Sequence, residues 1–240
     1  RNLSQEFGDL QLLGYDLPLR SLRPGETLPL ALYWKANVAP SEEYLIKLKL
    51  GKMMLSFSSP VHGSYPTTTW SAEEIVIDRH NPRVARDFPA GESPLSLAVS
   101  VSGHEIKEIS LDEIRIANVE REFEKPYSEY PADFVLGETF RLVGYSITTG
   151  PSLLIQLHWQ SILVNNTDYT VFVHATNTQG ILGAQSDSQP ADGSYPTSLW
   201  IESEFVEDIH TLTLPDGEYS LSIGMYLPTT GERLLLESGE

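Results

Sequence analysis

Two pairs of residues in this sequence carry side chains that could act together in chemistry: Asp78 with His80, and Asp208 with His210. The members of each pair are two positions apart, so on a β-strand their side chains point to the same face. A carboxylate and an imidazole placed in this way can share a hydrogen bond or a metal ion. A metal site would need further carboxylates to converge, and the nearest in sequence are Glu73, Glu74, Glu202 and Glu204. We therefore favour a surface pair on a strand and treat these four Asp and His residues as weak metal candidates.

Each Asp-His pair follows a segment rich in turn-forming and aromatic residues, GSYPTTTW at 63–70 and GSYPTSLW at 193–200. The proline holds the preceding tyrosine in extended geometry, so the loop is stiff. Tyr65 with Trp70, and Tyr195 with Trp200, could stack on the apolar faces of sugar rings. The competing interpretation is that each tryptophan plugs the end of the fold while each tyrosine braces the loop. If the rings do stack on sugars, glycan binding should be weak and should depend on Tyr195 and Trp200.

The two segments begin 130 residues apart (193 − 63 = 130). The same spacing separates the two Asp-His pairs and relates LLGY at 12–15 to LVGY at 142–145. Several separated motifs that share one offset indicate an internal duplication of a whole folding unit. The duplicated residues are mostly apolar, turn-forming and aromatic.

Catalytic and cofactor motifs are absent from the sequence. It has no cysteine and no Gly-x-Ser-x-Gly elbow, and we find no serine marked by a fixed spacing to a histidine. Phosphate-binding glycine patterns are missing as well. The sequence thus predicts no catalytic residue and no cofactor. A glycan hydrolase with paired carboxylates in an inter-domain cleft is the least favoured alternative.

The elements that must position these residues are predicted to be β-strands. Apolar residues alternate with others at Leu28, Leu30 and Leu32, at Leu153, Ile155 and Leu157, and through residues 44–50. Turn signals such as Arg23-Pro24-Gly25 and Pro215-Asp216-Gly217 separate the runs. About seven short strands in each copy predict two tandem antiparallel β-sandwiches, immunoglobulin-like or, alternatively, jelly rolls. Tyr219 after its turn is typical of an immunoglobulin tyrosine corner, and His158 and His174 should face outward.

We place the first sandwich at residues 1–117, a linker at 118–133 and the second sandwich at 134–240. The linker is polar, charged and interrupted by Pro126 and Pro131. Its aromatic residues Phe123, Tyr127 and Tyr130 are too many for a freely flexible tether, so part of it should pack. Leu12, Leu32, Leu142 and Leu157 should lie in the cores.

Charge and composition exclude some classes of partner. The net charge of −17 argues against nucleic acid, whose phosphates require a basic surface. Residues 1–122 have 13 Lys and Arg against 17 Asp and Glu (net −4), whereas residues 123–240 have 3 against 16 (net −13). A solvated acidic surface is the favoured interpretation, and a surface for a cation or a cationic partner is the alternative. No apolar run is long enough to span a bilayer, so we expect no direct membrane insertion of this chain.

The second copy resembles a known kind of domain. Its motifs are GY at 144–145, LHW at 157–159, DYTVFVH at 168–174, the loop at 193–200, LPDGEY at 214–219 and TGERL at 230–234. Together they are similar to the soluble C-terminal β-sandwich domains of multi-span bacterial membrane proteins of the glycosyltransferase type, an uncharacterised domain family. The likeness covers most of residues 134–236 and extends more weakly over 7–117. It implies no catalytic residue.

The resemblance implies an extracytoplasmic accessory domain, tethered through a membrane segment that precedes Arg1. We therefore expect a non-catalytic interaction module whose partner is a glycan or a membrane protein. A purely structural spacer or protein-docking domain is the main alternative.

Overall fold

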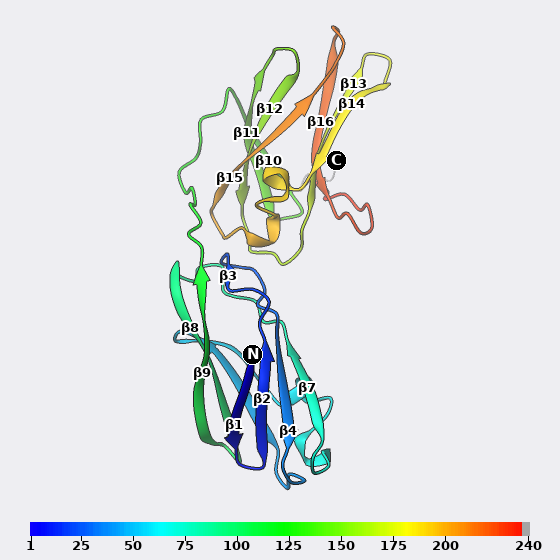
Figure 1. The fold of residues 1–240 in the computed structure, drawn as a ribbon. Helices are drawn as coiled ribbons and strands as arrows, with labels where there is room; N and C mark the ends of the chain where they lie inside the picture. The colour runs from blue at the N-terminus through cyan, green and yellow to red at the C-terminus, as the bar shows by residue number, and fades with distance from the viewer. Residues whose placement is uncertain (237–240) are drawn as a thin grey trace. The chain divides into compact units, whose positions relative to one another are not determined.

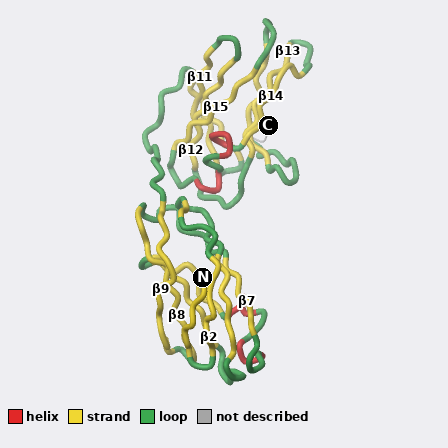
Figure 2. The backbone as a smooth tube through the Cα atoms, in the orientation of Figure 1, coloured by secondary structure: helices red, strands yellow, loops and turns green. Residues whose placement is uncertain are grey.

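The structure of the 240-residue chain is a computed structural model, which describes residues 1–236. Residues 237–240 of the predicted second sandwich lie outside this described part. The chain forms two compact units, Arg1–Val119 and Glu120–Glu240 (Figure 1). Both are all-β, and the helical turns are short 3-10 segments (Figure 2). No helix among residues 1–236 has the length and apolar character needed to cross a membrane.

The first unit is a sandwich of two sheets. One sheet has the order β1-β2-β4-β7 and the other the order β3-β9-β8-β5-β6. All pairings are antiparallel except that between β3 and β9. The strands are β1 (Asn2–Phe7), β2 (Leu10–Asp16), β3 (Ser21–Leu22), β4 (Leu30–Ala36), β5 (Tyr44–Leu50), β6 (Met53–Ser58), β7 (Ile75–His80), β8 (Gly91–Val101) and β9 (His104–Ile116).

The second unit repeats this plan with fewer strands. Its two sheets have the orders β10-β11-β12-β15 and β14-β13-β16, and every pairing is antiparallel. The strands are β10 (Tyr130–Leu136), β11 (Phe140–Thr148), β12 (Leu153–Ser161), β13 (Thr170–Asn177), β14 (Leu182–Ser188), β15 (Phe205–Leu212) and β16 (Tyr219–Tyr226). The predicted pair of antiparallel sandwiches is thereby confirmed.

The strand order differs from that of an immunoglobulin domain, in which the second and third strands lie in different sheets. Here β10, β11 and β12 are consecutive neighbours in one sheet. The predicted tyrosine corner is also wrong. The Tyr219 ring packs against Gly183 and Gly217, and no hydrogen bond of its hydroxyl is formed within residues 1–236.

Alternation of apolar and polar residues explains why these segments form half-buried strands. In β5, Tyr44, Ile46, Leu48 and Leu50 are buried, whereas the intervening lysines face outward. The ammonium groups of Lys47 and Lys49 reach the carboxylates of Glu105 and Glu108 on β9 at 3.4 and 2.5 Å. One face of the strand thus joins the core while the other is solvated.

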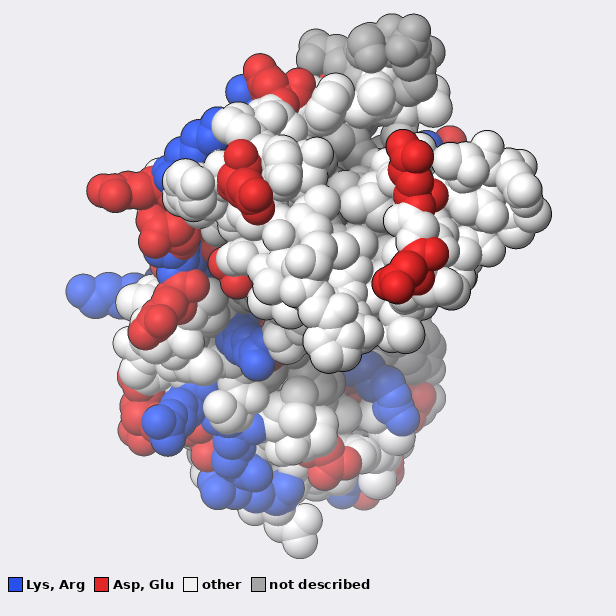
Figure 3. All heavy atoms as spheres, turned by 90° about the horizontal axis from the view of Figure 1, so that it is seen from above, with Lys and Arg blue, Asp and Glu red and all other residues white. Residues whose placement is uncertain are grey.

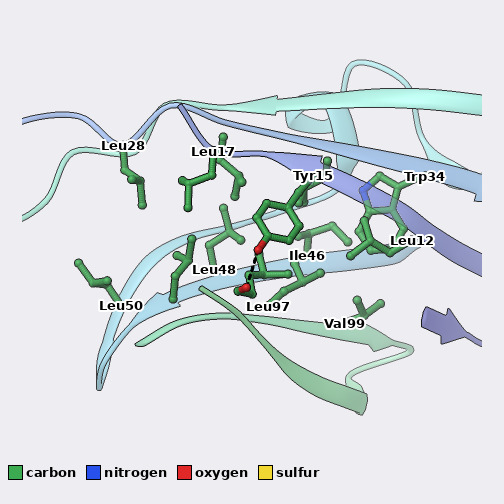
Figure 4. Close-up of a cluster of buried hydrophobic side chains, with 14 of the residues drawn as sticks. Leu12, Tyr15, Leu17, Leu28, Trp34, Ile46, Leu48, Leu50, Leu97 and Val99 are labelled. Atoms are coloured by element: carbon green, nitrogen blue, oxygen red, sulfur yellow. Dashed lines mark hydrogen bonds between the residues drawn. The ribbon is translucent and has the colours of Figure 1, made fainter. Parts of the chain in front are cut away.

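Each unit has its own core between its two sheets. Figure 4 shows side chains of the first core, with Leu12 and Trp34 from one sheet and Ile46, Leu48 and Leu97 from the other. The Tyr15 side chain extends across this core, and its hydroxyl donates a hydrogen bond of 2.5 Å to the carbonyl of Leu111. The predicted core residues Leu12, Leu32, Leu142 and Leu157 are all buried.

The burial of Trp200 predicts a large loss of stability on truncation. The indole is fully buried and contacts the Phe140 ring edge-to-face at 5.5 Å. Trp200→Ala should lower the free energy of unfolding of the second unit by about 3–5 kcal/mol, because it removes apolar contact and leaves a cavity. Chemical denaturation followed by circular dichroism measures this loss. Tyr127→Ala, at a ring that is 85% exposed, is the control and should cost no more than about 0.5 kcal/mol. A loss below about 1 kcal/mol for Trp200→Ala would contradict the buried position.

Candidate functional site

Residues 59–74 and 189–204, which we call the crossover loops, carry the chain from one sheet of each unit to the other. Each contains two short 3-10 turns, which are drawn in red in Figure 2. The repeated glycine, tyrosine, proline and tryptophan all lie in these loops. The predicted aromatic and Asp-His residues of each copy therefore belong to one local structure, formed by a crossover loop and the strand that follows it.

Each crossover loop begins with an uncommon backbone conformation. Val61 and His62 have φ values of 52° and 54°, and Ala191 and Asp192 have 52° and 51°. The left-handed region is unfavourable for residues with a Cβ atom, above all for β-branched ones such as valine. Such a turn persists only where the surrounding structure holds it in place.

A buried carboxylate holds each turn. Asp78 Oδ1 accepts the backbone N–H of Val61 at 2.7 Å, and Asp208 Oδ1 accepts that of Ala191 at 3.1 Å. The other carboxylate oxygen lies 2.7 Å from His80 Nε2 in the first unit and 2.9 Å from His210 Nε2 in the second. The shared face predicted for each pair is confirmed, but the expected surface location is wrong because all four side chains are buried.

A serine extends the network in the second unit. The Ser186 hydroxyl lies 2.9 Å from His210 Nδ1, so serine, histidine and aspartate form a hydrogen-bonded chain. The corresponding Ser56 also precedes its histidine by 24 residues (80 − 56 = 24; 210 − 186 = 24). Ser56 Oγ and His80 Nδ1 are both buried without a hydrogen-bond partner in residues 1–236. The expectation that no serine has a fixed spacing to a histidine is therefore wrong, and the shared separation was the signal.

This chain has the residue types of a hydrolase triad, but its geometry favours a structural role. His210 is only 1% exposed, and Ser186 directs its hydroxyl to that buried ring from within strand β14. A catalytic serine must present its oxygen to a substrate while the imidazole receives and returns the proton. Here the carboxylate is engaged by the backbone of the loop as well as by the imidazole. The network thus holds the crossover loop in shape.

The tryptophans are structural plugs. Trp70 is 2% exposed and Trp200 is fully buried, and their indole N–H groups donate to the carbonyls of Tyr65 and Tyr195 at 3.1 and 3.0 Å. Neither indole can offer a flat face to a sugar. The stacking platform proposed from the sequence is corrected accordingly, since the five-residue spacing returns the indole to the loop backbone rather than to solvent.

The tyrosines brace the loops through glutamates. Tyr65 Oη donates to Glu74 at 2.8 Å, and Tyr195 Oη donates to Glu204 at 2.7 Å. The second oxygen of each carboxylate accepts a backbone N–H, from Ser71 at 2.8 Å and from Ile201 at 2.9 Å. These glutamates are therefore part of the loop and do not converge on the Asp-His pairs. No group of three metal-binding side chains occurs in the described part of the chain.

The threonine of each repeated segment is a further structural residue that the sequence left unassigned. Thr67 and Thr197 are fully buried. Their hydroxyls accept the backbone N–H groups of Tyr44 and Tyr169, both at 2.9 Å, and donate to the carbonyls of Glu42 and Thr167 at 3.1 and 2.8 Å. The equal offset of the two threonines was the available signal.

His158 also differs from expectation, since it is buried rather than outward-facing. Its Nδ1 lies 2.7 Å from the Ser128 hydroxyl, and its Nε2 lies 4.0 Å from a Glu207 carboxylate oxygen. Burial lowers the pKa of His158, and the Glu207 carboxylate partly opposes this effect.

Ser128 belongs to the predicted linker, and so does Tyr130, whose ring stacks on Tyr145 at 5.1 Å. Tyr127, by contrast, is exposed.

A cleft of about 370 Å³ in the second unit offers a more accessible aromatic ring. It lies between the β11–β12 turn and the segment that enters β16, and its volume falls within the range of small-molecule sites. Its lining combines apolar side chains with the phenol of Tyr219 and the carboxylate of Asp216. The lining includes Ile147, Pro151, Leu153, Leu214, Asp216 and Tyr219.

Removing the Asp208 carboxylate charge should destabilise the second unit. Asp208→Asn weakens the bonds to the Ala191 N–H and to His210, so the free energy of unfolding should fall by about 1–3 kcal/mol. Chemical denaturation measures the change. Glu207→Gln, at the neighbouring and half-exposed carboxylate, is the matched control and should change stability by less than about 0.5 kcal/mol. Equal effects of the two substitutions would contradict the structural role of Asp208.

The lowered pKa of His158 predicts a loss of stability in acid. The unfolded chain binds a proton near the ordinary pKa of 6.5, whereas the folded chain binds it only at lower pH. The contribution of His158 is therefore complete above pH 6.5 and is lost as the pH falls towards the folded pKa, with a slope of at most about 1.4 kcal/mol per pH unit. The free energies of unfolding of wild type and His158→Gln should be compared from about pH 7.5 to about pH 5, a range that brackets the ordinary pKa. The two values should differ above pH 6.5 and approach each other as the pH falls below it. Parallel curves would contradict the prediction.

No protein-family model matches the sequence, and no similar protein was found among curated sequences.

Proposed function

We propose that this chain is a non-catalytic interaction module that works outside the cytoplasm as an accessory to a membrane protein of the glycosyltransferase type. One observation carries the absence of catalysis: the Asp, His and Glu side chains of the repeated motifs are engaged in holding the crossover loops, and the Ser186 hydroxyl is directed to the buried His210 ring. The resemblance of residues 134–236 supports the extracytoplasmic context. The all-β architecture agrees with that resemblance.

Matching details at one offset support a proposed internal duplication. Backbone φ is positive at Glu73 and at Ser203, as it is at the two pairs of residues that open the crossover loops. The aspartate, tyrosine and tryptophan hydrogen bonds of the first loop recur in the second at positions 130 residues later (for example, 208 − 78 = 130). The threonine bond also recurs, with the threonine at the same offset and its N–H partner 125 residues later (169 − 44 = 125). A copied unit accounts for so many shared details with a single event.

The Tyr219 cleft is the part of the second unit that best suits weak glycan contact. The ring offers an apolar face and a hydroxyl, and Asp216 adds an acceptor for sugar hydroxyls. The acidic side chains are scattered among uncharged ones on the face shown in Figure 3 and do not form one continuous patch. A neutral sugar suits such a surface better than an anionic polysaccharide, which the net charge of −17 repels at low salt.

A protein-docking or spacer role is the second candidate function. Exposed apolar side chains on the outer face of β7 favour docking, since Ile75 is 60% and Ile77 is 44% exposed. Glycan binding and protein docking require different surface features of this chain. A glycan needs the ring in the cleft, whereas a protein partner needs an apolar surface or a strand edge.

Glycan contact without turnover is the testable outcome of this proposal. Neutral oligosaccharides titrated into the chain should shift the amide NMR signals of residues 214–219, with a dissociation constant of about 1 mM. Tyr219→Ala should weaken binding by about tenfold, because it removes the stacking surface. Tyr127→Ala removes an exposed ring outside the cleft and is the control.

The same spectra should show no hydrolysis products, and chromogenic esters and phosphate esters should stay intact. Turnover that disappears in Ser186→Ala would overturn the non-catalytic assignment. If no sugar shifts these signals, or if Tyr219→Ala binds as wild type does, the glycan proposal fails and the docking or spacer role becomes the better account.

A further inference from the structure

The outer strands β7 and β15 occupy equivalent edges of the two four-stranded sheets. An edge strand presents backbone N–H and C=O groups that can pair with another extended segment. In the second unit such a segment is present: the N–H of Phe205 donates to the carbonyl of Glu122 at 2.8 Å, and the two residues form an antiparallel bridge. Glu122 lies in the predicted linker. The second unit thus covers the start of its own edge strand.

Arg121, the neighbour of Glu122, anchors this segment. Its Nη1 donates to Glu204 Oε2 at 2.6 Å, to the hydroxyl oxygen of Tyr195 at 2.5 Å and to the carbonyl of Leu199 at 3.3 Å. The Arg121 side chain is 11% exposed and that of Glu204 is 1% exposed. The site therefore combines strand pairing with a charge-assisted bond that is largely shielded from water.

The first unit has the same tyrosine hydroxyl and glutamate carboxylate at the equivalent positions. Tyr65 donates to Glu74 at 2.8 Å, and Glu74 accepts the Ser71 N–H at 2.8 Å, as in the second unit. These two bonds lower the pKa of Glu74, so its carboxylate is ionised at neutral pH. The neighbouring cation Lys35 pairs with Glu73 instead, at 2.6 Å. No arginine of the described residues bonds to Glu74 as Arg121 bonds to Glu204.

The surface around Glu74 is correspondingly open. Tyr65 is 37% exposed, whereas its counterpart Tyr195 lies beneath the Arg121 guanidinium, whose carbon is 5.9 Å from the ring centre. Ile75, the counterpart of Phe205, is 60% exposed, and Ile77 also faces outward. The edge therefore combines an anionic anchor with exposed β-branched side chains, which pair well with apolar residues on an adjacent strand.

We infer that the outer edge of β7, together with Glu74 and Tyr65, is a docking site for an extended peptide segment that carries an arginine. The segment pairs with Ile75 as Glu122 pairs with Phe205, and its guanidinium bonds to Glu74 and Tyr65 as that of Arg121 bonds to Glu204 and Tyr195. Arginine suits this site better than lysine because its planar guanidinium can lie over the tyrosine ring while it donates, as that of Arg121 lies 5.9 Å from the Tyr195 ring centre. An apolar residue after the bridging position, as Phe123 follows Glu122, would cover the exposed isoleucines.

This inference specifies the partner of the proposed interaction module. It does not involve the Tyr219 cleft, which lies in the other unit. Loss of glycan binding and loss of peptide binding are therefore separate results, so either proposal can fail while the other holds.

The chain itself supplies the probe, a labelled peptide with the sequence of residues 118–125 (NVEREFEK). Titrated with the full chain, the peptide should bind saturably at one site and shift the amide NMR signal of Ile75. The second unit should not compete for it, because its own attached segment is present at high effective concentration. Replacing the peptide arginine with glutamine should weaken binding about tenfold or more, and lysine should restore only part of the affinity.

Substitutions in the chain complete the test. Glu74→Gln should weaken binding about tenfold or more, whereas Glu73→Gln, which removes the same charge one residue away, should leave it within about twofold. Circular dichroism checks that both variants fold, and the peptide variants give the answer without altering the chain. Absence of saturable binding, equal effects of the two glutamate substitutions, or shifts confined to residues outside β7 and its crossover loop would each overturn the inference.

Discussion

The rest of the local structure depends on the hydrogen bonds of one buried carboxylate in each unit, which lies on the outer strand of the four-stranded sheet. Asp78 and Asp208 each bond to a backbone N–H in a left-handed turn and to a histidine on the same strand. Burying a carboxylate is costly unless its oxygens accept hydrogen bonds. The left-handed turn is therefore held next to this carboxylate where the chain crosses from one sheet to the other. The tyrosine, threonine and tryptophan that follow are placed by that crossing.

The crossover loops show how residues suited to catalysis can serve a fold. Serine, histidine and aspartate form a continuous hydrogen-bonded chain in the second unit, and a phenol bonded to a carboxylate lies in the same loop. Their hydrogen-bonding capacity is directed inward, to backbone groups and to one another. Burial makes each bond more consequential for stability because an unmet polar group in the interior is costly. Reactivity towards a substrate would require these same groups to face solvent.

The two units differ at the edge beside the crossover loop. In the second, a neighbouring segment brings Arg121 to Glu204, and both side chains are shielded from solvent. In the first, the equivalent glutamate and tyrosine are more exposed, and the edge carries outward isoleucines. Proteins commonly protect sheet edges because unpaired backbone groups invite association. One architecture thus presents a covered edge in one unit and an accessible edge in the other, and the accessible edge is the one that we propose binds a peptide.

The sequence by itself determined the strands, the two cores and the recurring motifs, because alternating apolar residues and a constant offset are local or periodic signals. Leu12, Leu32, Leu142 and Leu157 are buried as their patterns predict, and each aspartate shares a strand face with its histidine. Tertiary structure alone decided which of these faces meets solvent. Side chains at every second position share a face whether that face is inside or outside, so the Asp-His pairs, His158 and the tryptophans were open to either assignment. The pairing of Arg121 with Glu204, 83 residues apart, and the contrast between the two edges depend on contacts distant in sequence, which no local pattern encodes.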